Sequence, residues 1–254
     1  MSDPRLVIII QARFAASRLP GKVLAELGGR TVLGWTVERA RQAQLPGQVI
    51  VATSTDASDE PIAEFCEEAG YPYFRGSMHD VLDRYYQAAR QLGAQQIVRL
   101  TADCPIIDPA LIDQTIAAFA RAKPPLDFAA NRLPDQRTTP IGMDTEICTF
   151  AALETAWKET TAPHHREHVM PVFYEQPERF NILHVLHEPD YGHHRWTVDT
   201  PADLELLRRI VAHFAPRQDF TLAEVIELFE QHPDLYAINA RVQHKTQFDV
   251  DDRR

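Results

Sequence analysis

The sequence predicts an α/β protein built on a mostly parallel, Rossmann-like sheet. Leu6 to Ile10 is a continuous apolar run rich in β-branched residues, as expected of a strand buried on both faces. Val49 to Ala52 repeats that pattern, and segments with helical spacing of apolar residues separate such runs. Because strands alternate with helices over short loops, we expect parallel pairing with right-handed crossovers. Ligands of such sheets bind at the loops that follow the carboxyl ends of the strands.

The expected elements alternate regularly up to about residue 121, and the rhythm changes near Lys123. Expected strands cover 6–10, 49–52, 71–74, 95–100, 127–130, 145–148, 183–186 and 195–198, with the last two as a pair. Expected helices cover 31–44, 79–92, 109–121, 149–160, 164–175, 201–214 and 221–231. One more helix is expected between 31–44 and 79–92; Ser58 or Asp59 caps its start and Gly70 ends it. We expect 131–142 to be irregular and the tail from Gln243 to be loosely held.

Composition narrows the class of protein. The chain has 254 residues and 44% hydrophobic residues, enough for one large domain with a real core. Its formal net charge of -10 argues against a general nucleic-acid binder, which carries a basic face. The apolar run at Leu6 to Ile10 is too short for a membrane span or a signal-peptide core. The three cysteines are widely spaced, which predicts free buried thiols and no disulfide framework. We expect a cytoplasmic enzyme without membrane insertion.

A basic loop follows the first expected strand. It contains Arg13, Arg18 and Lys22 within ten residues, so residues 1–30 carry a net +3 while the rest of the chain carries -13. Guanidinium groups match phosphate oxygens in two-point contacts, and lysine adds a compact charge. Each close pair contributes roughly 4 kcal/mol before desolvation at an effective dielectric near 20. Charge alone leaves two interpretations open, a phosphate site and a solvated basic loop.

The loop carries a resemblance to a known family. Gln11 to Leu24, with Arg13, a loop of small residues and then Arg18-Leu19-Pro20-Gly21-Lys22, resembles the N-terminal signature of sugar-acid cytidylyltransferases. It is most similar to the branch named after spore-coat polysaccharide biosynthesis protein F, which is related to the synthetases of CMP-activated acidic sugars. The resemblance covers roughly residues 6–206. It implies nucleotide binding by Ala12, Arg13, Arg18, Lys22, Thr101 and Asp103.

Two segments depart from the family pattern. Phe14-Ala15-Ala16 stands where the family has a glycine, and Ala102 stands at a second glycine position. Alanine tolerates left-handed backbone poorly, so these departures bring close approach of the loop amides to phosphate into question. They keep open a catalytically silent nucleotide-binding protein as an alternative.

Two aspartates at expected strand ends are the metal candidates. Asp103 follows the strand that ends at Leu100, where a carboxylate can bind Mg²⁺ in the ligand crevice; a structural turn before Pro105 is the alternative. Asp199 ends the expected strand 195–198 and precedes Thr200-Pro201, so helix capping is its alternative role. The resemblance implies that Asp103 and Asp199 hold Mg²⁺, with Mn²⁺ as the second choice, and that Asp203 is structural.

Further segments match the family on the acceptor side. The resemblance implies substrate contacts from Asp83, Arg84, Asp144, Glu146, Arg166, Glu167, His168 and Arg195. For Asp83 and Arg84 a structural role is an equal alternative, and for Arg195 the alternative is an exposed loop. His165 and His168, or His164 and His168, share a helix face, but zinc needs a further ligand that the sequence does not reveal.

These observations together predict a nucleotidyltransferase. The resemblance implies a sheet of the glycosyltransferase-A or nucleotidyltransferase type in a single domain over 1–254, with a protruding substrate and dimerisation lobe at about 131–190. It implies catalysis by Arg13, Lys22, Asp103 and Asp199, with CTP and a sugar or sugar-acid as substrates, in a homodimer that makes precursors of cell-surface polysaccharide or glycoconjugates. A glycosyltransferase that uses a ready-made nucleotide sugar is the alternative enzyme.

Overall fold

A seven-stranded sheet forms the centre of the computed structural model, which describes residues 5–45 and 47–243. Its strands are β1 (Leu6–Gln11), β4 (Gln48–Ser54), β5 (Tyr73–Gly76), β6 (Gln96–Thr101), β7 (Phe128–Ala130), β10 (Glu146–Thr149) and β11 (Ile182–His184). The spatial order is β11-β7-β10-β6-β1-β4-β5, and all neighbours are parallel except that β10 runs antiparallel to β6 and β7. The predicted α/β class with a mostly parallel sheet is confirmed.

The remaining elements surround this sheet. Two small sheets pair β2 (Glu26–Leu27) with β3 (Arg30–Thr31) and β8 (Arg132–Leu133) with β9 (Gln136–Arg137). The helices are α1 (Val32–Ala40), α2 (Glu60–Ala69), α3 (Val81–Gln91), α4 (Pro109–Arg121), α5 (Phe150–Glu159), α6 (Pro163–His168), α7 (Pro171–Tyr174), α8 (Pro201–Phe214), α9 (Leu222–Gln231) and α10 (Tyr236–Asn239). Short 3₁₀ turns are η1 (Lys22–Leu24), η2 (Ala57–Asp59) and η3 (Pro233–Leu235).

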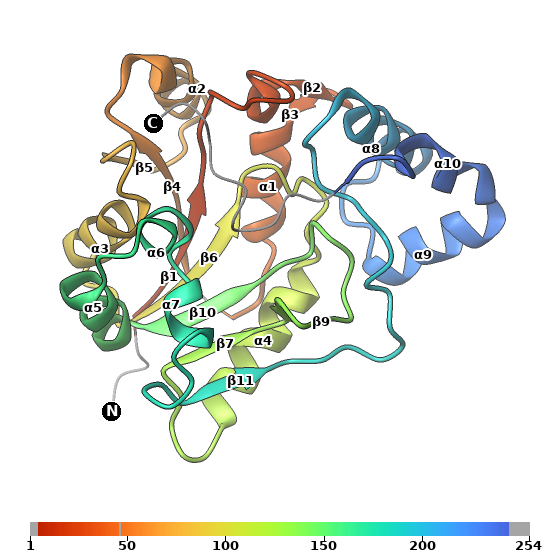
Figure 1. Ribbon diagram of the computed structural model, residues 1–254. Helices are drawn as coiled ribbons and strands as arrows, with labels where there is room; N and C mark the ends of the chain where they lie inside the picture. Colours follow the sequence, from red (N-terminus) through yellow and green to blue (C-terminus); the bar gives the residue numbers. More distant parts are fainter. Residues whose placement is uncertain (1–4, 46, 244–254) are drawn as a thin grey trace.

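The alternation of side chains along β1 divides the core into two layers. Ile8 and Ile10 pack into the cluster that includes α1, α4, α8 and α9, while Val7 and Ile9 pack into the cluster that includes α3, α5 and α7. In Figure 1, α1 and α4 accordingly lie behind the sheet and α6 and α7 lie in front of it. The carboxyl ends of β1 and β6 therefore open between these layers, and the loops that follow them can form a site.

Capping residues fix several helix ends as the sequence predicts. Asp108 caps α4 by accepting from the Ala110 amide at 2.8 Å, and its other oxygen accepts from the Leu222 amide at 2.6 Å, so one carboxylate joins α4 to the start of α9. Gly70 ends α2 in the left-handed conformation (φ 67°).

Three local expectations were wrong. The segment 164–175 is two helices, because Val169 adopts a φ of 70° and Pro171 follows with no N–H to continue the first helix. Residues 195–198 form no strand with 183–186; Arg195 makes a single bridge to Ile141. The stretch 131–142, expected to be irregular, contains the β8–β9 hairpin.

The segment 131–190 contributes to the main sheet as well as to the surface. Its strands β10 and β11 lie in the seven-stranded sheet, while β8 and β9 pair apart from it. The expectations of a lobe and of a dimer stay predictions. The expectation for the tail from Gln243 falls, from residue 244 on, outside the described residues.

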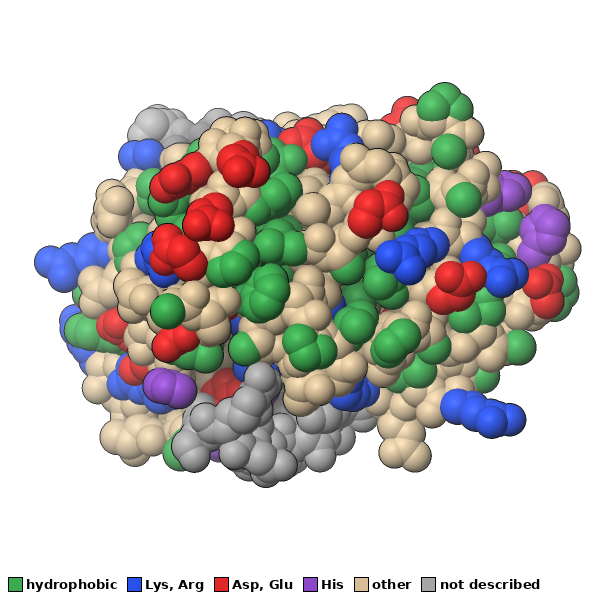
Figure 2. All heavy atoms as spheres, turned by 90° about the horizontal axis from the view of Figure 1, so that it is seen from above, with side chains coloured by type: hydrophobic (Ala, Val, Ile, Leu, Met, Phe, Trp, Pro, Cys, Tyr) green, Lys and Arg blue, Asp and Glu red, His purple; other side chains and the backbone are tan. Residues whose placement is uncertain are grey.

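The face shown in Figure 2 carries both positive and negative side chains. Lys and Arg side chains there lie among Asp and Glu side chains and between exposed apolar groups, rather than forming one continuous basic area. Within the described ranges, none of the helices is both long and apolar enough to cross a bilayer.

Candidate active site

The basic loop after β1 is tied down near both ends. The Phe14 amide donates to Asp59 Oδ1 at 2.7 Å, and the Gly21 amide donates to the Phe14 carbonyl at 2.9 Å. Gly21 has a φ of 71°, and a Cβ there would lie 3.0 Å from the Phe14 ring, so glycine is required for both conformation and space. This closure holds Arg13, Arg18 and Lys22 at the carboxyl edge of the sheet, where all three line one cavity.

The alanines that replace family glycines adopt ordinary backbone conformations. Among the described residues, Val169 is the one non-glycine residue with a positive φ. Ala15, Ala16 and Ala102 therefore need no left-handed backbone, and the loss of glycine at these positions introduces no strain of that kind. The backbone at these alanines therefore does not favour a catalytically silent protein.

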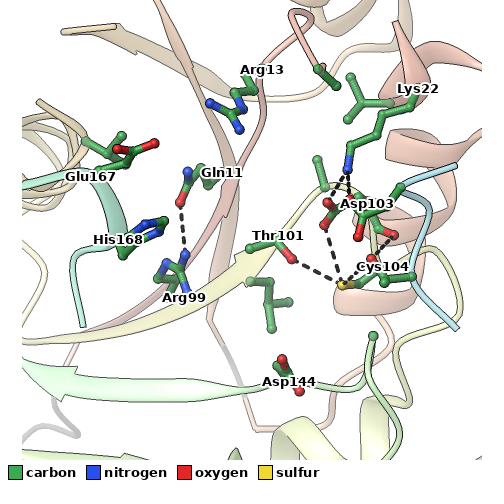
Figure 3. A pocket seen from close by; sticks show the side chains of 18 of the residues that line it. Gln11, Arg13, Lys22, Arg99, Thr101, Asp103, Cys104, Asp144, Glu167 and His168 are labelled. Atoms are coloured by element: carbon green, nitrogen blue, oxygen red, sulfur yellow. Dashed lines mark hydrogen bonds and ion pairs between the residues drawn. The ribbon is translucent and has the colours of Figure 1, made fainter. Parts of the chain in front are cut away.

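Asp103 and Asp199 lie side by side although 96 positions separate them in the numbering. The Val198 amide donates to the Asp103 carbonyl at 2.8 Å, and the Thr197 hydroxyl donates to the same oxygen at 3.1 Å. Lys22 Nζ then lies 2.6 Å from Asp103 Oδ2 and 2.8 Å from Asp199 Oδ1 (Figure 3 shows its contact with Asp103). We call Lys22, Asp103 and Asp199 the lysine cluster.

The lysine cluster is strongly coupled electrostatically. Burial alone would lower the pKa of Lys22, but Asp103 and Asp199 outweigh burial and raise it, so the ammonium stays charged. Burial alone would raise the pKa of Asp199, yet Lys22 and the arginines at its other oxygen hold that pKa far below its usual range. Those arginines are Arg195, at 2.6 Å, and Arg18, at 3.0 Å from Asp199 Oδ2.

The cap of α8 leaves the Asp199 side chain available. Thr200 is the N-cap residue, in a capping box with Asp203, so capping is not the role of Asp199. Asp203 is buried and accepts from Arg195 Nε and from Asn239 Nδ2, both at 3.0 Å. Arg195 is therefore held by Asp203 and Asn239 while it contacts Asp199, which excludes the exposed-loop alternative for Arg195.

The donor set of the lysine cluster fits a hard divalent cation. Two carboxylates from distant segments already converge on one cationic atom, and oxygen ligands are those that Mg²⁺ prefers. Each carboxylate is about a quarter or less exposed, so phosphate oxygens of a substrate have room to complete the coordination.

One cavity of about 440 Å³ contains most of the predicted site residues. Its lining includes the predicted residues Arg13, Arg18, Lys22, Arg84, Thr101, Asp103, Asp144, Glu146, Glu167, His168 and Asp199. In Figure 3, Glu167 and His168 lie on the side of the cavity away from Lys22 and Asp103, with Arg13 and Gln11 between. The structure therefore brings the basic loop, the carboxylates and α6 around a common space.

Ala12, Asp83, Arg166 and Arg195 are predicted site residues that do not line the cavity. Ala12 is buried and donates its amide to Ala52. Asp83 accepts from Trp157 Nε1 at 2.9 Å, and Arg166 donates to the Trp157 carbonyl at 2.6 Å. Asp83 and Arg166 thus connect α3 to the α5–α6 region, while Arg195 acts from behind Asp199.

Arg84 differs from its neighbour Asp83. It is 2% exposed and lines the cavity, and its Nε has no hydrogen-bond partner among the described residues. Burial lowers the pKa of Arg84, and nearby Arg13 adds to that effect, while Asp59 opposes it. A buried guanidinium in this position favours an anionic group of a ligand.

Two carboxylates that line the cavity, Glu146 and Asp144, are each paired with an arginine. Arg99 on β6 contacts Glu146 on β10, and its Nη2 donates to Gln11 Oε1 at 3.3 Å. Arg137 on β9 forms a two-point contact with Asp144, at 2.9 Å for Nη2–Oδ2. We call Arg99–Glu146 and Arg137–Asp144 the arginine pairs.

Sequence reasoning missed several further residues that line the cavity, among them Gln11, Asp59, Arg99, Arg132 and Tyr174. A usable signal existed for Arg99, because a charged residue inside a strand buried on both faces requires a partner. Asp59 offered no local signal beyond a capping pattern, since its contact with the Phe14 amide joins segments 45 residues apart.

Cys104 lines the cavity but is not a reactive thiol. Burial, and then the neighbouring Asp103, raise the pKa of the Cys104 thiol well above its usual value. Its sulfur lies 3.1 Å from the Thr101 hydroxyl. This supports a packing role, as the sequence predicts.

Comparison with known proteins agrees with this geometry. The family model described as cytidylyltransferase matches residues 7–251. The chain is 31% identical over 247 residues to the spore coat polysaccharide biosynthesis protein SpsF of Bacillus subtilis, covering 90% of this chain and 95% of that protein. A solved cytidylyltransferase of Leptospira borgpetersenii is 33% identical, with a TM-score of 0.87 over 95% of this chain and all of that one.

A more distant structure shares the fold. CMP:2-keto-3-deoxy-manno-octonic acid synthetase, solved in complex with CTP, is 20% identical, with a TM-score of 0.62 over 82% of this chain and 99% of that chain. The match of the family model to nearly the whole chain decides the assignment. The chain belongs to the cytidylyltransferase family and is a CTP-dependent nucleotidyltransferase.

Proposed function

We propose that the protein transfers the CMP group of CTP to a sugar or sugar-acid and releases pyrophosphate. The observation that carries this proposal is the convergence of Asp103 and Asp199 on Lys22 of the basic loop inside one cavity. Phosphoryl and nucleotidyl transfer rests mainly on positioning and charge neutralisation, and this arrangement offers both. The names of two similar proteins support the acceptor class: one is a spore coat polysaccharide biosynthesis protein, and the other is a CMP:2-keto-3-deoxy-manno-octonic acid synthetase.

Arg13, Arg18 and Lys22 are proposed to hold the triphosphate. Their side chains line the cavity together with Thr101, next to the loop that the Phe14–Gly21 bond closes. Guanidinium groups offer paired donors to phosphate oxygens, and Lys22 offers a compact charge. With the phosphates in place, Lys22 exchanges its carboxylate partners for phosphate oxygens and keeps its charge compensated.

Asp103 and Asp199 are proposed to hold Mg²⁺, with Mn²⁺ as the alternative ion. When bound by these carboxylates, the ion would supply positive charge to phosphate oxygens and to the pyrophosphate leaving group. Arg195, fixed by Asp203 and Asn239, keeps Asp199 oriented and ionised. The acceptor oxygen forms a bond to the α-phosphorus while the bond from that phosphorus to pyrophosphate breaks.

The acceptor is proposed to lie between the lysine cluster and α6. Glu167 and His168 face that space, and Asp144 and Glu146 bound it on the floor, each held by an arginine. Carboxylates that are already paired present their remaining lone pairs to sugar hydroxyls in fixed positions. We also propose that 131–190 forms the acceptor side and a homodimer contact; light scattering of the purified chain checks the dimer.

A pyrophosphate-release screen tests the activity. Four nucleoside triphosphates are crossed with acidic and neutral sugars in the presence of Mg²⁺, and products are identified by mass spectrometry. We expect release with CTP and a sugar or sugar-acid, with a CMP-sugar as product. Release of a nucleoside diphosphate from a nucleotide sugar supports the glycosyltransferase alternative instead. CTP binding without pyrophosphate release for any pair contradicts the proposal and favours a silent protein.

A further inference from the structure

A cluster of two histidines and a glutamate lies outside the cavity. His164 and His165 are on α6, and Glu175 is the C-cap residue of α7. Glu175 Oε2 lies 2.9 Å from His164 Nε2 and 2.7 Å from His165 Nε2. One ligand atom from each of the three residues lies within 4.8 Å of the other two. None of the three lines the cavity that contains the lysine cluster.

The environment of His165 prepares its Nε2 atom for a ligand. His165 is buried, and its Nδ1 lies 2.7 Å from the Thr160 hydroxyl. A partner at one ring nitrogen fixes the ring and directs the other nitrogen, which is the usual arrangement behind a metal-bound histidine. Here Thr160 directs His165 Nε2 toward the oxygen that His164 also approaches.

The donor atoms select the class of metal. Two imidazole nitrogens and one carboxylate oxygen suit Zn²⁺ and similar transition-metal ions, whereas Mg²⁺ prefers oxygen ligands. Ligand atoms around tetrahedral Zn²⁺ lie about 3.4 Å apart, given bond lengths near 2.0 to 2.1 Å. The distances between the Glu175 oxygen and the histidine nitrogens, 2.9 and 2.7 Å, are hydrogen-bond distances, so binding of an ion would replace these hydrogen bonds and move the side chains apart. His164 and Glu175 are partly exposed, which leaves a path of entry and room for a water as fourth ligand.

We propose that His164, His165 and Glu175 form a second metal site, for Zn²⁺ or a similar transition-metal ion, that fixes α6 against α7. The two helices are joined at Val169, which holds an unusual positive φ of 70°. Glu167 and His168 on α6 and Tyr174 on α7 line the cavity on the side that faces the basic loop. An ion bound between α6 and α7 holds these wall residues in place from behind. The site is distinct from the oxygen-only site at Asp103 and Asp199.

Metal titration tests the proposal without measuring turnover, so the outcome is independent of the proposed function. The chelator-treated full chain carrying Asp103→Asn is titrated with Zn²⁺, Co²⁺ and Mg²⁺ by calorimetry, with Co²⁺ absorption as a geometric readout. The Asp103→Asn background weakens the other metal site, and all three cysteines are buried, which limits binding to thiols. We expect one equivalent of Zn²⁺, a tetrahedral Co²⁺ spectrum and no binding of Mg²⁺ at this site.

Variants then locate the ion. His164→Ala and Glu175→Gln should each weaken Zn²⁺ binding at least tenfold and abolish the rise in Tm that Zn²⁺ gives the parent chain. His213→Ala is the matched control, because His213 and His232 also have neighbouring rings, 6.1 Å apart, and are not among the groups of three or more ligand residues in the described part. Absence of Zn²⁺ binding, equal binding by His164→Ala, or binding with no rise in Tm overturns the proposal.

Discussion

The lysine cluster and the arginine pairs compensate charge in different ways within one cavity. In the lysine cluster, a single ammonium group lies between two carboxylates, at 2.6 and 2.8 Å. In the arginine pairs, Glu146 contacts Arg99, and Asp144 is held by two nitrogens of Arg137 with Arg132 Nε at 3.9 Å. Ammonium is a compact charge without directional constraint, whereas guanidinium fixes its partner's orientation. We therefore expect the ammonium contacts of the lysine cluster to exchange for another cation while Arg195 keeps Asp199 oriented, and the arginine pairs to fix the shape of the cavity.

The largest effect is expected from Asp103→Asn. The substitution removes one of the two carboxylates while preserving the shape of the side chain, and Lys22 keeps Asp199 at 2.8 Å. We expect pyrophosphate release to fall about 10²- to 10³-fold or more, as for loss of a group that stabilises transition-state charge. Turnover at saturating CTP and Mg²⁺ measures this, with circular dichroism as a check of folding.

The exposed Asp234→Asn is the matched control for Asp103→Asn and should leave turnover unchanged. If Asp103→Asn retains turnover within twofold of the parent chain, the lysine cluster is not the metal site. The lysine cluster and the arginine pairs would then not differ in their ability to bind a metal ion.

Lys22→Met tests whether the Lys22 ammonium occupies the place of a metal ion between Asp103 and Asp199. Without Mg²⁺ the variant leaves two carboxylates near each other, so we expect a loss of stability of about 3 kcal/mol, as for a broken buried pair. Because no ammonium then competes, Mg²⁺ should raise the Tm of the variant more than that of the parent chain. Turnover should fall about 10²-fold with the loss of a phosphate contact.

Thermal unfolding with and without Mg²⁺ checks the Lys22→Met prediction. Lys158→Met, at an exposed pair with Glu154, is the control and should change stability by less than about 0.5 kcal/mol. An equal Mg²⁺ response in the variant and the parent chain contradicts the idea that Lys22 occupies the place of a cation.

The same two sets of charges show how far the sequence predicts a site. Lys22, Asp103 and Asp199 stand near a strand end or a helix start, so local pattern marked them as candidates, and the family resemblance was needed to choose the site over a solvated loop, a turn or a cap. The Arg99–Glu146 pair depends on β10 entering the sheet antiparallel beside β6, in the register that sets Glu146 opposite Arg99. Such pairing is decided by long-range packing, and no local period records it.

The helical segment 164–175 shows the same limit in the fold. Its apolar spacing suggests one helix, and Pro171 was a visible signal for a break. The positive φ of Val169 was not visible, because β-branched residues rarely adopt it and only the surrounding packing enforces it. The break determines which residues meet Glu175, so the histidine cluster could not be predicted from helix periodicity alone.

Arg84 belongs neither to the lysine cluster nor to the arginine pairs. It is a buried arginine for which the described part of the chain provides no hydrogen bond or ion pair. We expect Arg84→Met to raise the Tm of the ligand-free protein, since it removes a buried charge that makes no direct ion pair with the described residues. It should also raise the KM for CTP or for the acceptor about tenfold, by removing an anion contact.

Asp83→Asn is the neighbouring control for Arg84→Met. Asp83 accepts hydrogen bonds from Trp157 and Gln87 away from the cavity, so its loss should lower Tm slightly and leave both KM values unchanged. Melting curves and steady-state kinetics separate the two. A fall in Tm with unchanged KM for Arg84→Met contradicts the assignment of Arg84 to ligand binding.

The smallest effect concerns the support behind the lysine cluster, which is aromatic rather than charged. His194 precedes Arg195, is 3% exposed, and packs on Trp196, Phe229 and Tyr236. Burial lowers the pKa of His194 to about 4, so the folded protein keeps the ring neutral while the unfolded chain binds a proton below about 6.5. Stability is then constant above pH 6.5 and decreases as the pH falls toward 4.

His194→Phe should remove this pH dependence and preserve the aromatic packing. At pH 5 the parent chain should lose about 1 to 2 kcal/mol relative to pH 7.5 through this histidine, after allowance for solvent screening. Urea unfolding at the two pH values measures the loss, and the exposed His213→Asn serves as control for the other histidines. At pH 7.5 the side chain at position 194 is uncharged in both the parent chain and the variant, so turnover should not change. If His194→Phe and the parent chain lose the same free energy of unfolding between pH 7.5 and pH 5, His194 is not the source of the pH dependence.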